Sequence, residues 1–102
     1  MEKAPEEILK AIEESKPECL LTEAQRIING ARKTDYGDAR ENHEKIAEFW
    51  SSILGNPVTA EQVVLCMIGV KMARLCLSPE HRDSWVDIAG YVGVKSKMNR
   101  GE

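Results

Sequence analysis

The feature that most constrains this fold is an apolar segment in the middle of the chain. From Val63 to Val70 every residue is apolar or glycine. A Thr-x-x-Gln pattern at residues 59–62 precedes it, with the spacing of a reciprocal helix cap. β-Branched residues would also suit a buried strand, but the cap and the continuation to Leu75 through two basic residues favour a helix. A helix that is apolar on all sides is typical of the centre of a bundle, so we expect the other segments to pack around it.

Two helices are predicted before this segment. The first covers about Pro5–Ser15, with proline at the first helical position and acidic residues in the first turn. Its apolar stripe is thin, so residues 1–20 are expected to be peripheral. The second begins at Thr22, in another Thr-x-x-Gln capping box, and ends near Lys33.

Two further helices flank the apolar segment. The one before it runs from Asp38 to Leu54, and Gly55 can end it. Its apolar residues have the spacing i, i+3, i+4, i+7, i+8, at Ile46, Phe49, Trp50, Ile53 and Leu54. The last helix begins near Ser78 or slightly later and fades near Lys95. The sequence therefore predicts an all-α fold, a single small antiparallel bundle of four to five helices over residues 1–102.

Composition limits the classes of partner. With 102 residues, 42% of them hydrophobic, the chain suits one domain with a modest core. A net charge of -3 with interspersed signs argues against general nucleic-acid binding. The apolar segment is too short to cross a membrane, and the charged N-terminus does not resemble a secretory signal. An odd number of cysteines without C-x-x-C spacing predicts reduced, buried thiols in a cytoplasmic protein, at Cys19, Cys66 and Cys76.

Polar residues interrupt the predicted packing surfaces. Asn42 lies one turn before Ile46 and is expected to face inward, where it would bond to a neighbouring loop or to a ligand. Glu41 and Glu44 form an E-x-x-E pair, for which spacing alone favours a solvated flank. His81 could carry a proton near neutral pH, although a histidine at such a position is more often a helix cap or a surface residue.

Basic and acidic residues face one another on the last two predicted helices. Lys71 and Arg74 lie on the central helix and need partners, because burying an unpaired charge is costly. On the next helix Glu80, Asp83 and Asp87 share one face, and neighbouring acids repel unless a cation lies between them. That cation is either a basic side chain in a structural ion pair or a metal such as Mg²⁺, which prefers oxygen ligands.

A joint pattern over about residues 26–92 carries a resemblance. It reads R-x-x-x-Y-G-D, then N-x-x-x-I-A-x-x-W, then K-x-A-R-L, then P-x-H-x-D-S-W-x-D-I-A-G-Y. It resembles a family of small uncharacterised proteins of tailed phages and prophages, with the pattern core at about 22–94. That family is similar to phage domains associated with nucleotide modification. More distantly, it is similar to the MazG-like all-α nucleoside triphosphate pyrophosphohydrolases, in which E-x-x-E and E-x-x-D motifs on two helices hold Mg²⁺.

The resemblance implies roles for individual residues. Mg²⁺ would be bound by Glu41 and Glu44 together with either Glu80 and Asp83 or Asp83 and Asp87. Asp83, Asp87 and His81 would be catalytic. The nucleotide would be bound by Tyr36, Asn42, Lys71, Arg74 and Trp85, with Tyr36 or Trp85 stacking on a base.

Three functional hypotheses follow. The first is a nucleotide-binding phage protein in the bacterial host cytoplasm, with Mg²⁺-dependent release of pyrophosphate if it is an enzyme. The second is a module that sequesters a nucleotide or contacts a host protein without turnover. The third is a structural helical protein whose inward polar groups form one satisfied network. The resemblance also implies a homo-oligomer, because MazG-like sites often lie between subunits, and a thin core gains from association.

Overall fold

The residues that the structure describes form a small all-α bundle with four longer helices, as predicted. A computed structural model describes residues 4–8, 18–30 and 39–100, and these residues contain no strand. The helices are α2 (Leu20–Asn29), α4 (Ala39–Leu54), α5 (Ala60–Leu77) and α6 (Arg82–Asn99). Residues 5–8 form one further helical turn. In the described ranges no helix has both the length and the apolar character needed to cross a bilayer.

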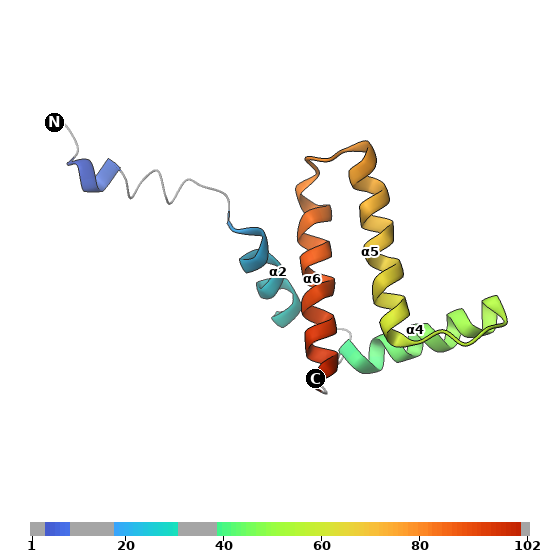
Figure 1. Ribbon diagram of the computed structural model, residues 1–102. Helices are drawn as coiled ribbons and strands as arrows, with labels where there is room; N and C mark the ends of the chain where they lie inside the picture. The colour runs from blue at the N-terminus through green and yellow to red at the C-terminus, as the bar shows by residue number, and fades with distance from the viewer. Residues whose placement is uncertain (1–3, 9–17, 31–38, 101–102) are drawn as a thin grey trace.

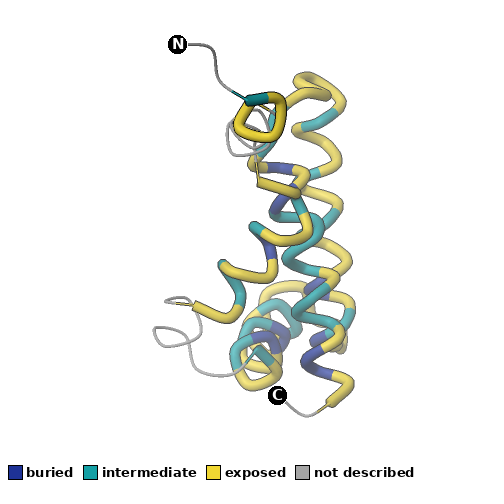
Figure 2. Tube along the Cα trace, turned by 90° about the vertical axis from the view of Figure 1, so that its left-hand side faces the viewer, coloured by how far each residue is buried: buried dark blue, intermediate teal, exposed yellow. Residues whose placement is uncertain are grey.

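Helices α5 and α6 form an antiparallel hairpin that organises the rest (Figure 1). Its tip is the connection at residues 78–81, and its foot is where α5 begins and α6 ends. Helix α2 packs on the side of α6 away from α5, and α4 crosses the foot and projects beyond α5. A core cluster lies near the foot and consists of Ala60, Val64 and Met98, with Ala39, Ile68, Tyr91 and Val94 packed against it. The core is small, and most of the tube in Figure 2 is coloured intermediate or exposed.

Local sequence explains where α4 ends and α5 begins. Gly55 has a φ of 71°, a conformation that glycine adopts at no steric cost, so α4 stops at the predicted place. The capping box of α5 is present in both directions. The amide of Gln62 donates to Thr59 Oγ1 at 3.1 Å, and the amide of Thr59 donates to Gln62 Oε1 at 2.9 Å.

The predicted start of α2 was wrong. Helix α2 begins at Leu20, so Thr22 lies in its first turn and is not the capping residue. Helix α6 begins at Arg82, the later of the two starts allowed by the prediction of Ser78 or slightly later, and it continues past Lys95 to Asn99. The His81 ring accepts a hydrogen bond from the Ser84 amide at 3.2 Å, which confirms the interpretation of this histidine as a helix cap. The predicted remainder of the first helix and the predicted end at Lys33 lie outside the described residues.

Helix α2 is attached to α6 along its length. Gly90 and Gly93 leave room for Ile28, and a Cβ atom at residue 93 would overlap Ile28 Cδ1. Lys97 is buried, and its Nζ donates to the Ile28 carbonyl at 3.2 Å, close to the C-terminal end of α2. A cation at that end also interacts favourably with the helix dipole.

The central helix is covered on one side only, which corrects the expectation that α5 is surrounded. Its outward face, opposite α6, carries the exposed residues Leu65, Cys66, Gly69, Val70, Met72, Ala73, Cys76 and Leu77. Beyond α5 the far end of α4 likewise exposes Phe49, Ile53 and Leu54, although the stripe predicted them to be inside. We call these three residues the α4 arm.

The orientation of α6 agrees with the prediction on one side and differs on the other. The side that carries Asp87 faces α5, as predicted, and Tyr91, Val94 and Met98 continue it as packing residues. The side expected to be apolar faces outward at Trp85 and Val92, which are exposed.

Candidate functional site

The polar seam predicted between α5 and α6 exists, and one ion pair closes it. Lys71 Nζ lies 2.9 Å from Asp87 Oδ2, and the two side chains are 27% and 25% exposed. Because the hairpin is antiparallel, this pair continues the line of packing contacts made by Val64, Ile68 and Tyr91. The cation that satisfies Asp87 is therefore Lys71, and the pair fixes the register of the two helices.

Closer to the hairpin tip the remaining charged residues are open to solvent. Arg74, Glu80 and Asp83 are all exposed. Trp85 is 46% exposed, and its Nε1 donates to the Pro79 carbonyl at 2.8 Å. His81 caps α6, with Nδ1 also 2.8 Å from Ser84 Oγ, so this ring nitrogen is already engaged.

The two predicted carboxylate motifs lie at opposite ends of α6. Arg40, at the start of α4, donates to the Met98 carbonyl at 2.8 Å, which places Glu41 and Glu44 at the foot of the hairpin. Asp83 lies fifteen residues before Met98 along α6, which corresponds to roughly 22 Å of helix. Oxygen ligands lie about 2 Å from Mg²⁺, so the two motifs cannot share an ion within one chain.

The predicted metal set therefore does not fit Mg²⁺ in the single chain. Among the described residues, no group of three or more His, Cys, Asp or Glu side chains could hold a metal ion. Glu44 is also engaged by Arg40, whose Nε is 3.1 Å from its Oε1. Asn42 is half-buried, as expected, and Tyr36 lies outside the described residues. The roles of these residues toward a metal or nucleotide stay predictions.

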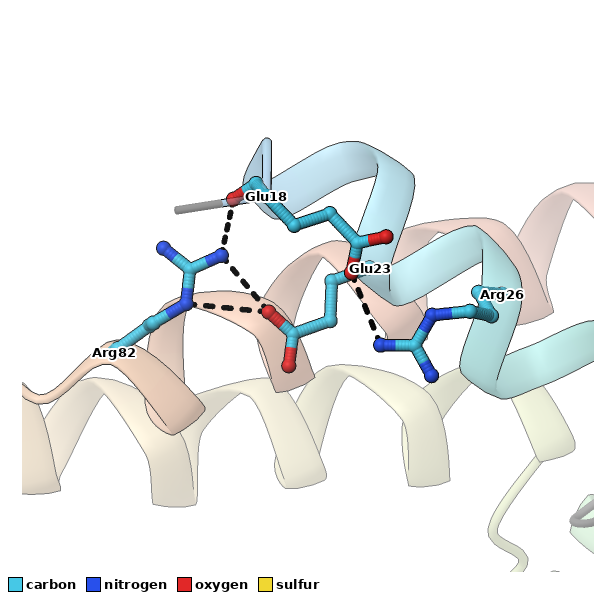
Figure 3. Close-up of polar contacts among 4 residues, drawn as sticks. All are labelled: Glu18, Glu23, Arg26 and Arg82. Atoms are coloured by element: carbon cyan, nitrogen blue, oxygen red, sulfur yellow. Dashed lines mark hydrogen bonds and ion pairs between the residues drawn. The ribbon is translucent and has the colours of Figure 1, made fainter. Parts of the chain in front are cut away.

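The hydrogen-bonded network between α2 and α6 was missed by the sequence reasoning (Figure 3). Arg82 Nη2 lies 2.8 Å from Glu23 Oε2, and the same nitrogen donates to the Glu18 carbonyl. Glu18 Oε1 in turn pairs with Arg26 Nη2 at 3.0 Å. No spacing rule links residues 18–26 to residue 82, so only the folded chain reveals this network. It holds the start of α2 against the start of α6.

Every buried side-chain nitrogen and oxygen atom in the described part of the chain has a hydrogen-bond partner. His43 illustrates this, because it is buried on α4 and its Nδ1 lies 2.7 Å from the Ala39 carbonyl, one helical turn away. Buried polar atoms that await a ligand are the usual sign of a prepared binding site. The buried polar groups are therefore accounted for by hydrogen bonds within the fold.

The cysteines are free, as predicted, but all three are exposed rather than buried. Cys19 precedes the first turn of α2 and makes no side-chain hydrogen bond that caps the helix. The backbone amides of Thr22 and Leu21 beside the sulfur, and to a smaller extent the Thr22 side chain and the Arg82 charge, lower the pKa of the Cys19 thiol.

A shallow groove of about 570 Å³ lies between α4 and the start of α5. It is open to solvent, and its lining includes the acidic residues Glu44 and Glu48 with Ser51, Ser52 and Thr59. Two carboxylates at the rim do not favour a phosphate group there.

Comparison with known proteins identifies the family of this chain. Residues 19–99 match the family described as "Domain of unknown function (DUF6378)". The chain belongs to the DUF6378 family. This match, together with the mycobacteriophage relatives below, confirms the phage resemblance. It gives no support to the relationship with nucleotide-modification domains or MazG-like enzymes.

Two relatives are mycobacteriophage proteins. The Gene 55 protein of Mycobacterium phage L5 is 50% identical over 84 residues, which cover 81% of this chain and 54% of that protein. The Gene 55 protein of Mycobacterium phage D29 is 43% identical over 81 residues, or 79% of this chain and 54% of that protein. The chain thus spans about half the length of these curated relatives. No solved structure matches the chain.

Proposed function

We propose that this DUF6378 chain is a homotypic assembly module, which associates through the outward face of α5 and the α4 arm. The observation that carries the proposal is the size of the uncovered apolar surface. Seven large apolar side chains on these two elements are between 57% and 89% exposed: Phe49, Ile53, Leu54, Leu65, Val70, Met72 and Leu77.

The area matches what a stable interface needs. At roughly 180 Å² for a fully exposed large side chain, the seven residues present on the order of 850 Å². A standard protein interface buries about 800 Å² on each partner. Covered together, the two regions are therefore large enough for one partner molecule of this kind.

The composition of α5 supports the same proposal. An exposed helix face in a monomer usually carries charged residues, whereas this face is apolar from Leu65 to Leu77. The single charged residue beside it without a partner on α6 is Arg74. Lys71 is turned inward to Asp87, so the charges of α5 leave the outward face free for packing.

Sedimentation equilibrium over a range of protein concentrations tests this role. We expect the wild-type chain to form a defined oligomer, and Val70→Lys to raise its dissociation constant more than about tenfold. Ser96→Lys adds the same charge at an exposed position of α6 and should leave the equilibrium unchanged. A wild-type chain that stays monomeric up to about 1 mM would contradict the proposal.

Nucleotide binding is the second candidate, and the hairpin tip favours it. Arg74 and Asp83 are exposed there, and the ring of Trp85 is half-exposed and available for stacking. A guanidinium group suits a phosphate, and an indole suits a base. The test is the melting temperature with nucleoside triphosphates, with and without Mg²⁺, in wild type and Arg74→Gln. Release of pyrophosphate measured in parallel would separate turnover from binding. No increase in melting temperature with any common nucleotide would exclude this candidate.

A further inference from the structure

The middle of the outward face of α5 is lined by small residues. Cys66, Gly69, Ala73 and Cys76 follow one another at helical spacing, and all are exposed. A Cβ atom placed on Gly69 would meet nothing within 4 Å. Larger apolar residues flank this row on both sides, at Leu65, Val70, Met72 and Leu77. Because the row of small side chains lies between larger ones, the backbone of a second helix can approach closely. The distance between the two helix axes would then lie toward the short end of the usual 8–10 Å.

The outward face can meet its own copy without opposing like charges. Between Leu65 and Leu77 its exposed residues are apolar, and Arg74 lies at the edge. In a two-fold arrangement the same patch faces itself, so a patch with a central charge would repel its copy. With antiparallel helices crossing at Gly69, the two Arg74 residues would be about 15 Å apart along the helix axes, which is beyond the Debye length at physiological salt.

The length of α5 indicates where each hairpin tip would reach. Gly69 lies midway along the 18 residues of α5, which is about 27 Å long. An antiparallel crossing at Gly69 therefore brings Leu77 of one copy level with the start of α5 in the other. At that level α4 projects beyond α5, on the side away from α6 (Figure 1).

Resting on the assembly role proposed above, we infer that two copies pack their α5 helices antiparallel across Gly69, with each hairpin tip against the α4 arm of the other copy. This arrangement covers the two uncovered apolar regions with one contact. Leu77, 89% exposed in the single chain, meets Ile53, which is 79% exposed. A parallel pairing would instead place the two tips together and the two feet together, so Leu77 of one copy would not meet Ile53 of the other.

Disulfide mapping between two single-cysteine variants tests the arrangement. Cys19, Cys66 and Cys76 are first changed to Ser, and Leu77→Cys is then introduced in one protein and Ile53→Cys in the other. After mixing and mild oxidation, we expect a covalent dimer that joins residue 53 of one chain to residue 77 of the other. The matched control is Glu48→Cys, at an exposed position of α4 on a different face from Ile53, which should not join to residue 77.

The outcomes separate this arrangement from the assembly role itself. A wild-type dimer that gives 77–77 bridges and no 53–77 bridge would overturn the antiparallel arrangement and leave homotypic assembly standing. A wild-type monomer would overturn both. As an independent measurement, Gly69→Ile should weaken the dimer more than about tenfold while helicity is retained, because the added side chain fills the crossing point. An unchanged dissociation constant for Gly69→Ile would place the contact elsewhere.

Discussion

Replacing Asp87 with Asn would leave Lys71 charged at the α5–α6 contact without its partner. The two atoms of the pair are 2.9 Å apart, and each side chain is about one quarter exposed. Exposed pairs contribute about 0–1 kcal/mol, whereas breaking a fully buried pair costs about 3–5 kcal/mol. Solvent screening places this pair near the lower range, so we expect Asp87→Asn to lower the free energy of unfolding by about 1–2 kcal/mol. Urea denaturation followed by circular dichroism, at one protein concentration, measures the loss.

Two further variants make the Asp87 prediction specific. Removing both charges in Lys71→Met with Asp87→Leu should recover most of the loss, because no uncompensated charge then remains at the contact. Asp83→Asn, one turn away and exposed, should cost less than about 1 kcal/mol, the usual contribution of an acid in the first turn of a helix. An Asp87→Asn variant as stable as wild type, or more stable, would refute the structural interpretation. It would indicate that the carboxylate is held for a ligand.

Three other predictions concern single positions. In urea denaturation, Gly93→Ala should be less stable than Gly90→Ala by about 1 kcal/mol, because only residue 93 lacks room beside Ile28 and the end of that side chain must shift. Equal stabilities would contradict the close packing of α2. Cys19 should be alkylated at lower pH than an unperturbed thiol, because its lowered pKa gives more thiolate; a rate profile that matches free cysteine would argue against this. Thr59→Ala should lower stability by about 1 kcal/mol in thermal unfolding, and Thr59→Ser should not.

Local signals in the sequence were sufficient where one short stretch decides the structure. The capping box at Thr59 and the positive φ of Gly55 depend on neighbouring residues alone, so the boundary between α4 and α5 could be predicted. The start of α6 was predicted less closely, near Ser78 or slightly later, because two neighbouring stretches could each begin the helix; the structure selects the later one, with His81 as the cap.

The charged residues of the candidate site could be predicted from the sequence, but the ion pair that they form could not. Spacing placed Lys71 on one helix and Asp87 on the next, and it showed that a cation was needed between them. It could not choose between Lys71, Arg74 and a metal, because that choice depends on the register of two packed helices. The same limit explains the exposed Phe49. Periodicity shows that a face is apolar, but not whether the same chain covers it.

The final turn of α6 joins all the other helices. Met98 completes the core with α5, its carbonyl accepts from Arg40 of α4, and the neighbouring Lys97 holds the end of α2. The contacts that close the fold are thus formed by the helix that leaves the ribosome last among the four. A nascent chain interrupted before α6 would present α5 with both of its apolar sides uncovered. The domain therefore depends on complete synthesis of α6, or on a chaperone until then, to avoid premature association.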